Sequence, residues 1–161
     1  MREQDGFRTF ERAVTARPDR LAIALGVAGL LPQAAALLAP TLGMGWVDPA
    51  HLALVYGALI LSFLGGSWWG IALTQAAGQQ RAILLLLGIG ASLTGFCVQG
   101  LASAGAIRVL LLILGAVLAA SWLVDRTLVR DGLIGGWWGR LRLLLSLGLG
   151  GLTMLVGVTA G

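Results

Sequence analysis

Residues 62–70 read Ser-Phe-Leu-Gly-Gly-Ser-Trp-Trp-Gly and lie near the end of an apolar run over residues 51–74 that contains no charged side chain. A helix over this run would be about 36 Å long, at about 1.5 Å per residue, which is enough to cross a bilayer with some tilt. Small residues alternate here with very bulky ones, a pattern typical of membrane helices that pack closely against neighbours. We therefore expect a membrane-spanning helix to form around this stretch.

The composition of the whole chain indicates a protein that crosses the membrane several times. Hydrophobic residues make up 58% of the 161 positions and charged residues only 11%, whereas a soluble domain has about 25% charged residues. All eleven basic residues are arginines. They lie in the expected connections and at the ends of spans rather than on one face, so we do not expect a nucleic-acid partner.

The hydrophobic pattern predicts an all-α fold, a single five-helix membrane bundle over residues 21–161. A charged segment, residues 1–20, precedes it and is either an amphipathic helix at the membrane surface or a loosely ordered polar tail. Pro32 should kink the first helix, and either a neighbouring helix or a side chain, with Gln33 as a candidate, should satisfy the carbonyl group that proline leaves free. The expected spans are 21–39, 51–74, 82–101, 107–124 and 143–160, with 125–142 as the longest of the later loops.

The arginines also predict an orientation. With five spans, residues 1–20, 75–81 and 125–142 share one side of the membrane and hold ten arginines, whereas the other side holds only Arg108. Positively charged loops stay in the cytoplasm. We therefore expect a cytoplasmic N-terminus and an external C-terminus.

Small residues four positions apart suggest where the helices touch. Such spacing forms a stripe on one helix face and lets two backbones approach closely. We expect this stripe to pack the bundle internally, with a dimerisation face as the alternative. The candidate packing residues are Ser62, Gly66 and Gly70 in the second span, Gly88 and Ser92 in the third, and Ser146 and Gly150 in the fifth.

Aromatic residues give a second set of candidates, for a ligand pocket or for the membrane interface. Trp68 and Trp69 point about 100° apart on a helix, so at least one of them should face lipid or headgroups. An interfacial aromatic belt explains both better than a pocket for a hydrophobic ligand. Tyr56 and Trp137 belong to the same set of candidates.

Charged residues near the end of the fourth span form a third group. Asp125 could pair with Arg140 or Arg142 and fix the helix ends, and these arginines with Arg126 could also hold anionic lipid headgroups. No catalytic set, metal cluster or phosphate loop is recognisable in the sequence, and no Asp, Glu or His is expected at mid-membrane depth. We therefore expect no enzyme, no metal and no cofactor.

The sequence resembles a family of small multi-span membrane proteins that are similar to transmembrane protein 69 and are known as domain of unknown function 3429. The matching motifs are Leu25-Gly26-Val27-Ala28-Gly29-Leu30-Leu31-Pro32, Tyr56-Gly57, Ser62-Phe63-Leu64-Gly65-Gly66, Trp69-Gly70, Asp125, Gly132-Leu133, Trp137 and Leu141-Arg142. Three positions depart from the family pattern. Trp68 stands where a histidine is usual, Trp138 replaces a tyrosine, and a proline near Gly135 is missing. The family is bacterial, so the resemblance implies a small multi-span protein of a bacterial inner (cytoplasmic) membrane, and it transfers no activity.

Two functional hypotheses follow from these observations. The first is a non-enzymatic accessory, assembly or scaffold component that packs against other integral membrane proteins or a second copy of itself. The alternative is a binder or carrier of a small hydrophobic molecule, such as a lipid, quinone or pigment, between its helices. Membrane lipids are expected partners under both hypotheses.

Overall fold

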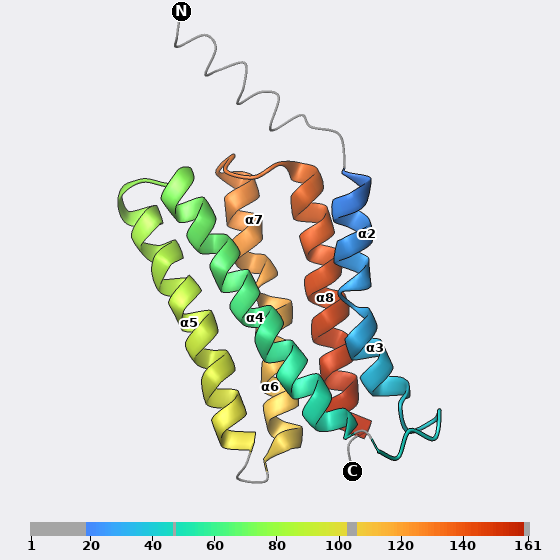
Figure 1. Cartoon of the computed structure of the whole chain (residues 1–161). Helices are drawn as coiled ribbons and strands as arrows, with labels where there is room; N and C mark the ends of the chain where they lie inside the picture. The colour runs from blue at the N-terminus through green and yellow to red at the C-terminus, as the bar shows by residue number, and fades with distance from the viewer. Residues whose placement is uncertain (1–18, 47, 103–105, 160–161) are drawn as a thin grey trace, which may run out of the picture.

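The computed structural model describes residues 19–46, 48–102 and 106–159, which form helices and short connections and contain no strand. Five helical stretches are long and apolar enough to cross a membrane, which confirms the predicted all-α, five-span membrane fold (Figure 1). The predicted amphipathic helix in residues 1–20 lies almost wholly outside the described residues. The helices are α2 (Arg20–Ala28), α3 (Leu31–Leu38), α4 (Pro49–Thr74), α5 (Gly78–Ala102), α6 (Ile107–Ala120), α7 (Trp122–Arg130) and α8 (Gly136–Thr159).

The first span is interrupted near Pro32, as expected, and a neighbouring helix supplies a hydrogen bond to the backbone at the break. Helix α2 ends at Ala28 and α3 begins at Leu31, and the Tyr56 hydroxyl donates to the Gly29 carbonyl oxygen at 2.5 Å. The prediction that Gln33 would bind a carbonyl group freed in its own helix is wrong. Its Nε2 reaches other helices, donating to the Ala53 carbonyl at 3.3 Å and to Thr153 Oγ1 at 2.6 Å.

The connection between the fourth and fifth spans is much shorter than predicted. Helix α7 continues the fourth span to Arg130, and α8 begins at Gly136, so the predicted loop over residues 125–142 is helical at both ends. Gly132 turns the chain with a φ of 73°, which glycine adopts without steric cost. The charges that suggested a loop are accommodated because two of them pair inside the bundle.

Helices α4 and α5 pack closely, as do α6 and α8, through glycine at each contact. A side chain at Gly65 would overlap the Gly88 carbonyl oxygen, and a Cβ at Gly150 would lie 2.6 Å from the Gly115 carbonyl oxygen. Between lipid-like surfaces such close packing gains dispersion contacts that the hydrophobic effect does not supply. The α4–α5 and α6–α8 pairs, which we call the glycine-packed pairs, are therefore the closest helix–helix contacts of the fold.

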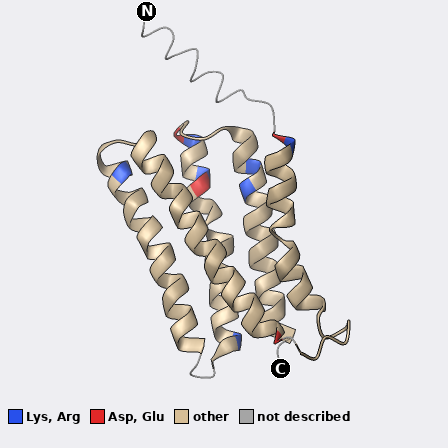
Figure 2. Cartoon of the chain, in the orientation of Figure 1, with Lys and Arg blue, Asp and Glu red and all other residues tan. Residues whose placement is uncertain are grey.

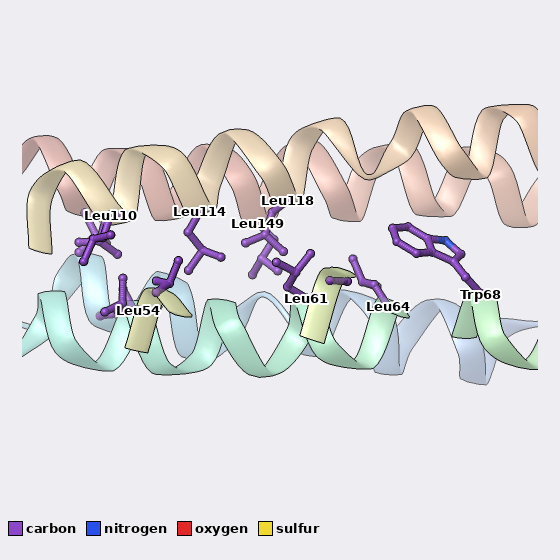
Figure 3. Packing of buried hydrophobic residues seen from close by; sticks show 14 of the residues in the cluster. Leu54, Leu61, Leu64, Trp68, Leu110, Leu114, Leu118 and Leu149 are labelled. Atoms are coloured by element: carbon purple, nitrogen blue, oxygen red, sulfur yellow. The ribbon is translucent and has the colours of Figure 1, made fainter. Parts of the chain in front are cut away.

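A layer of leucines joins the two pairs. Side chains from α4 point toward side chains from α6 and α8 along the length of the bundle (Figure 3). Leu54 and Leu61 of α4 and Leu111, Leu114 and Leu118 of α6 are each no more than 1% exposed. The leucine layer is therefore the hydrophobic core of the fold.

The described charges gather at one end of the bundle, the end where α2 begins (Figure 2). Only Arg108 and Asp48 of the described charged residues lie toward the other end. We call the first the arginine-rich end; its described basic residues are Arg20, Arg81, Arg126, Arg130, Arg140 and Arg142.

A buried Trp–Asp–Arg cluster beside an apolar cavity

The candidate site lies near the arginine-rich end, where one polar side chain from each of α4, α7 and α8 joins a hydrogen-bonded cluster. Asp125 accepts a hydrogen bond from Trp68 Nε1 on Oδ1, at 3.1 Å, and one from Arg142 Nε on Oδ2, at 2.9 Å. All three side chains are buried, with exposed fractions of 1% for Asp125, 4% for Trp68 and 7% for Arg142. The carboxylate is therefore surrounded by protein donors.

The neighbouring serines hold α8 in register with the α6–α7 junction. Ser121 lies between α6 and α7, donates its hydroxyl proton to the Leu118 carbonyl at 2.6 Å, and lies 3.2 Å from the Ser146 hydroxyl. Ser146 follows Arg142 by one helical turn on α8, so both residues face the same side of that helix. Arg142 and Ser146, on consecutive turns of α8, thus both make polar contacts with the segment around the α6–α7 junction.

The Arg142 guanidinium group is only partly satisfied by Asp125. Nη2 lies 2.8 Å from Asp125 Oδ2 and so belongs to the ion pair, although it makes no well-aligned hydrogen bond in the described part of the chain and is itself fully buried. An unmade hydrogen bond on a buried polar group costs about 1–3 kcal/mol, and more when the group is charged. Nη2 is therefore buried within the ion pair rather than exposed to an external acceptor.

Arg142 also lines a cavity of about 160 Å³ between α2, α4 and α8. Arg142 and Ser146 are its only polar lining residues, and leucines, an isoleucine, a phenylalanine and two glycines form the rest of the wall. An engineered apolar cavity of about 150 Å³ takes up benzene. The site can therefore hold one ring or a short stretch of hydrocarbon, with Arg142 and Ser146 as polar residues in its wall.

The predicted packing residues divide into two groups. Gly88, Ser146 and Gly150 are buried, and Ser62 lies against α5, where its Oγ would be 3.3 Å from a Cβ at Gly95.

Gly66, Gly70 and Ser92 lie outside the internal contacts. They are exposed, and no atom of the protein lies within 4 Å of a Cβ built on either glycine. The buried stripe of α4 instead passes through Gly65, which points about 100° away from Gly66.

The aromatic candidates also divide. Trp68 does not belong to the interfacial belt that the sequence suggested, because its indole is buried on Asp125. Trp69 is 38% exposed and donates to the Leu85 carbonyl at 2.9 Å. Tyr56 is half-buried on Gly29, and Trp137 packs edge-on against Trp138 at a centroid distance of 5.7 Å. None of these last three lines the cavity.

Of the predicted ion-pair residues, Asp125 pairs with Arg142 and not with Arg140. Arg126 lies instead over the Trp122 ring, 5.5 Å from its centroid. Sequence reasoning did not select Gln33, Thr153 or Ser121 as site residues, although each is a polar residue in a span, where such residues require a partner. Within the described residues, no group of His, Cys, Asp and Glu could hold a metal ion.

Comparison with known proteins gives two matches. The family described as "Protein of unknown function (DUF3429)" matches residues 18–158. Transmembrane protein 69 of Xenopus tropicalis is 46% identical over 55 residues, which are 34% of this chain and 22% of that protein's length. No solved structure matches the chain.

Proposed function

The chain belongs to the family Protein of unknown function (DUF3429), whose name carries no activity, and we propose that it is a non-enzymatic membrane protein that binds a small amphipathic molecule. The single observation behind this proposal is the cavity beside Arg142. Arg142, buried and paired with Asp125, lines an otherwise apolar space between membrane helices. A site of this kind suits a ligand with an apolar body and one polar end.

The charge of the cluster suggests which polar end fits. Asp125 already balances the charge of Arg142, so a second full negative charge would have to be desolvated without a new counter-charge. A neutral oxygen, such as a quinone carbonyl or the ester carbonyl of a lipid, avoids this cost. The proposed ligand is therefore a carbonyl-bearing molecule of the membrane.

Two tryptophan variants on one helix test this proposal. Leu25 and Leu21 are both 65% exposed on α2 and lie one turn apart, but only Leu25 lines the cavity. The full-length protein is purified in mild detergent, and its bound small molecules are extracted and identified by mass spectrometry. We expect a near-stoichiometric carbonyl-bearing molecule in the wild type and in Leu21→Trp, and about tenfold less in Leu25→Trp, because bulk at the rim competes for the space.

Equal recovery from both variants, or no small molecule from any of them, would contradict the binding proposal. A molecule that the protein returns chemically altered would contradict its non-enzymatic part.

A second candidate function rests on Gly66 and Gly70. We propose it separately, as a contact of α4 with another membrane protein or a second copy. Both glycines are exposed, four residues apart, and unused by the internal packing, which is the pattern of helix association in membranes. The observation supports an accessory or scaffold role.

Neighbouring glycines provide a matched test of this second candidate. Gly66→Leu adds a side chain where no atom lies within 4 Å, whereas Gly65→Leu forces one into the backbone of α5. We expect Gly66→Leu to preserve the folded monomer and to lose a stoichiometric partner or dimer, measured by cross-linking in membranes. Gly65→Leu should lower the stability of the monomer itself. A Gly66→Leu protein that cross-links like the wild type would exclude this face.

The distribution of arginine supports a location for either function. We propose a bacterial cytoplasmic membrane with the arginine-rich end toward the cytoplasm, since positively charged ends are retained there.

A further inference from the structure

A second hollow lies at the arginine-rich end, separate from the cavity of the proposed function. It is an open groove of about 410 Å³ between α7 and the start of α8. One face of each helix forms it: Trp122, Arg126, Val129 and Arg130 from α7, and Gly136, Gly139, Arg140 and Leu143 from α8. We call it the α7–α8 groove.

Glycine keeps the groove open. Gly139 is buried, and a side chain there would collide with Val129. Gly136 has no atom within 4 Å of its Cβ position, so the first turn of α8 leaves this part of the groove unfilled. The two helices thus lie close together while the space over their junction remains accessible.

The groove carries an excess of positive charge. Of its three arginines, Arg130 is paired with Asp131, at 3.2 Å. Among the described residues no carboxylate forms an ion pair with Arg126 or Arg140, and Asp125 is occupied by Arg142. Both of these arginines are exposed, so their guanidinium groups can reach an incoming anion.

The polarity of the groove changes along its length. Arg130 and Gly136 lie at the ends of their helices, where the chain leaves the span. Trp122 and Leu143 lie about two turns deeper, with Arg126 and Arg140 between these two levels. A hollow that is cationic near the water and apolar deeper in the membrane matches the order of groups in a phospholipid, from phosphate to acyl chain.

We propose that the α7–α8 groove binds an anionic phospholipid, with its phosphate held by Arg126 and Arg140 and the start of an acyl chain along Trp122 and Leu143. Guanidinium groups bind phosphate oxygens through paired, charge-assisted hydrogen bonds. The cation–π contact holds Arg126 against Trp122, with its carbon atom 5.5 Å from the ring centroid, so less side-chain freedom is lost when lipid binds.

The test compares two double variants that remove the same charge. In Arg126→Gln/Arg140→Gln both of the groove arginines without a carboxylate partner are lost. In Arg20→Gln/Arg81→Gln two exposed arginines of the same end are lost, and neither lines the groove. The full-length proteins in detergent are titrated with phosphatidylglycerol or with phosphatidylcholine of the same acyl chains, and the bound lipid is counted by native mass spectrometry.

We expect the wild type to prefer phosphatidylglycerol, and the groove variant to bind it about thirtyfold more weakly, as two arginines near a membrane surface would predict. The matched control should bind like the wild type, and added salt should weaken binding. Equal loss in both double variants, or no preference between the lipids, would overturn the proposal.

Two more titrations distinguish a lipid in the groove from a soluble anion there and from a lipid in the cavity. Inorganic phosphate tests whether the groove takes a soluble anion; binding as strong as that of phosphatidylglycerol would overturn the assignment to a lipid. Leu25→Trp alters only the cavity beside Arg142, so it should leave phosphatidylglycerol binding unchanged. Loss of phosphatidylglycerol in Leu25→Trp would place the lipid in that cavity and overturn the groove.

Discussion

At the scale of single residues, the arginine-rich end depends most on Asp125. Its carboxylate accepts from Trp68 and from Arg142, so three helices, α4, α7 and α8, meet on one buried charge. Removing a charge from water is costly, and a partner repays that cost only with good geometry and further hydrogen bonds. The Trp68 indole supplies such a bond on the second carboxylate oxygen.

Replacing Asp125 alone should therefore strongly lower the stability of the protein. In Asp125→Leu the Arg142 side chain remains buried without a counter-charge, and we expect the free energy of unfolding to fall by about 3–5 kcal/mol. In Asp125→Leu/Arg142→Leu no charge remains, and much of the loss should be recovered. Both values can be measured by denaturant titration in mixed micelles, followed by tryptophan fluorescence.

The exposed pair at the end of α7 provides the control for this prediction. Arg130 and Asp131 also form an ion pair, but the Arg130 side chain is 77% exposed, and exposed pairs contribute little. Asp131→Leu should leave stability nearly unchanged. A single Asp125→Leu variant as stable as the double variant would show that the buried charge is not what holds these helices.

At the scale of elements, the break between α2 and α3 is compensated by other helices. Tyr56 of α4 binds the Gly29 carbonyl group, and Gln33 of α3 binds Ala53 of α4 and Thr153 of α8. These bonds attach the interrupted span to two uninterrupted ones. The first span is therefore held by polar contacts as well as by packing.

Tyr56→Phe tests this attachment because it removes one hydroxyl and little else. We expect the free energy of unfolding to fall by about 1 kcal/mol, with faster hydrogen exchange at the amides of residues 30, 31, 33 and 34, since a carbonyl at the break loses its donor. Thr94→Val is the control, because the Thr94 hydroxyl bonds only within its own helix, to Gly90. Unchanged exchange at these amides would mean that packing alone fixes the break.

Sequence reasoning predicted elements better than the contacts between them. Five spans and the interruption at Pro32 followed from hydropathy and from proline chemistry. Hydropathy did not predict where the fourth span ends. Charged residues such as Asp125 and Arg142 indicate a loop unless they are known to be buried against each other. The expectation that Gly66 rather than Gly65 packs the bundle internally was wrong for a related reason. Small residues occur on both faces of α4, and a one-residue shift rotates the stripe by about 100°.

At the scale of the whole molecule, the candidate site combines residues from distant parts of the chain. Trp68, Asp125 and Arg142 are each identifiable from the sequence, but for other roles: an interfacial belt for the tryptophan, and an interfacial ion pair or lipid contact for the charges. The cavity could not have been predicted, because it depends on how α2, α4 and α8 diverge. Hydropathy places residues in spans but does not determine the angles between them.

The proposed orientation makes a prediction about the whole molecule. Gln79 lies at the arginine-rich end and Thr41 in the connection at the other end, and both are exposed. In a Cys97→Ala background, a membrane-impermeant maleimide should label Thr41→Cys in intact cells but label Gln79→Cys only after permeabilisation. The reverse pattern would place the arginine-rich end outside.

The two glycine-packed pairs also make the fold unevenly stiff. Where backbone meets backbone, as at Gly65 with Gly88 and at Gly115 with Gly150, there is no side-chain rotamer to change, so sliding is resisted. The leucine layer between the pairs can yield, because leucine side chains have alternative rotamers. The cavity beside Arg142 lies on this compliant layer, between α4 and α8. Uptake of a larger guest should therefore tilt one pair of helices against the other rather than bend any single helix.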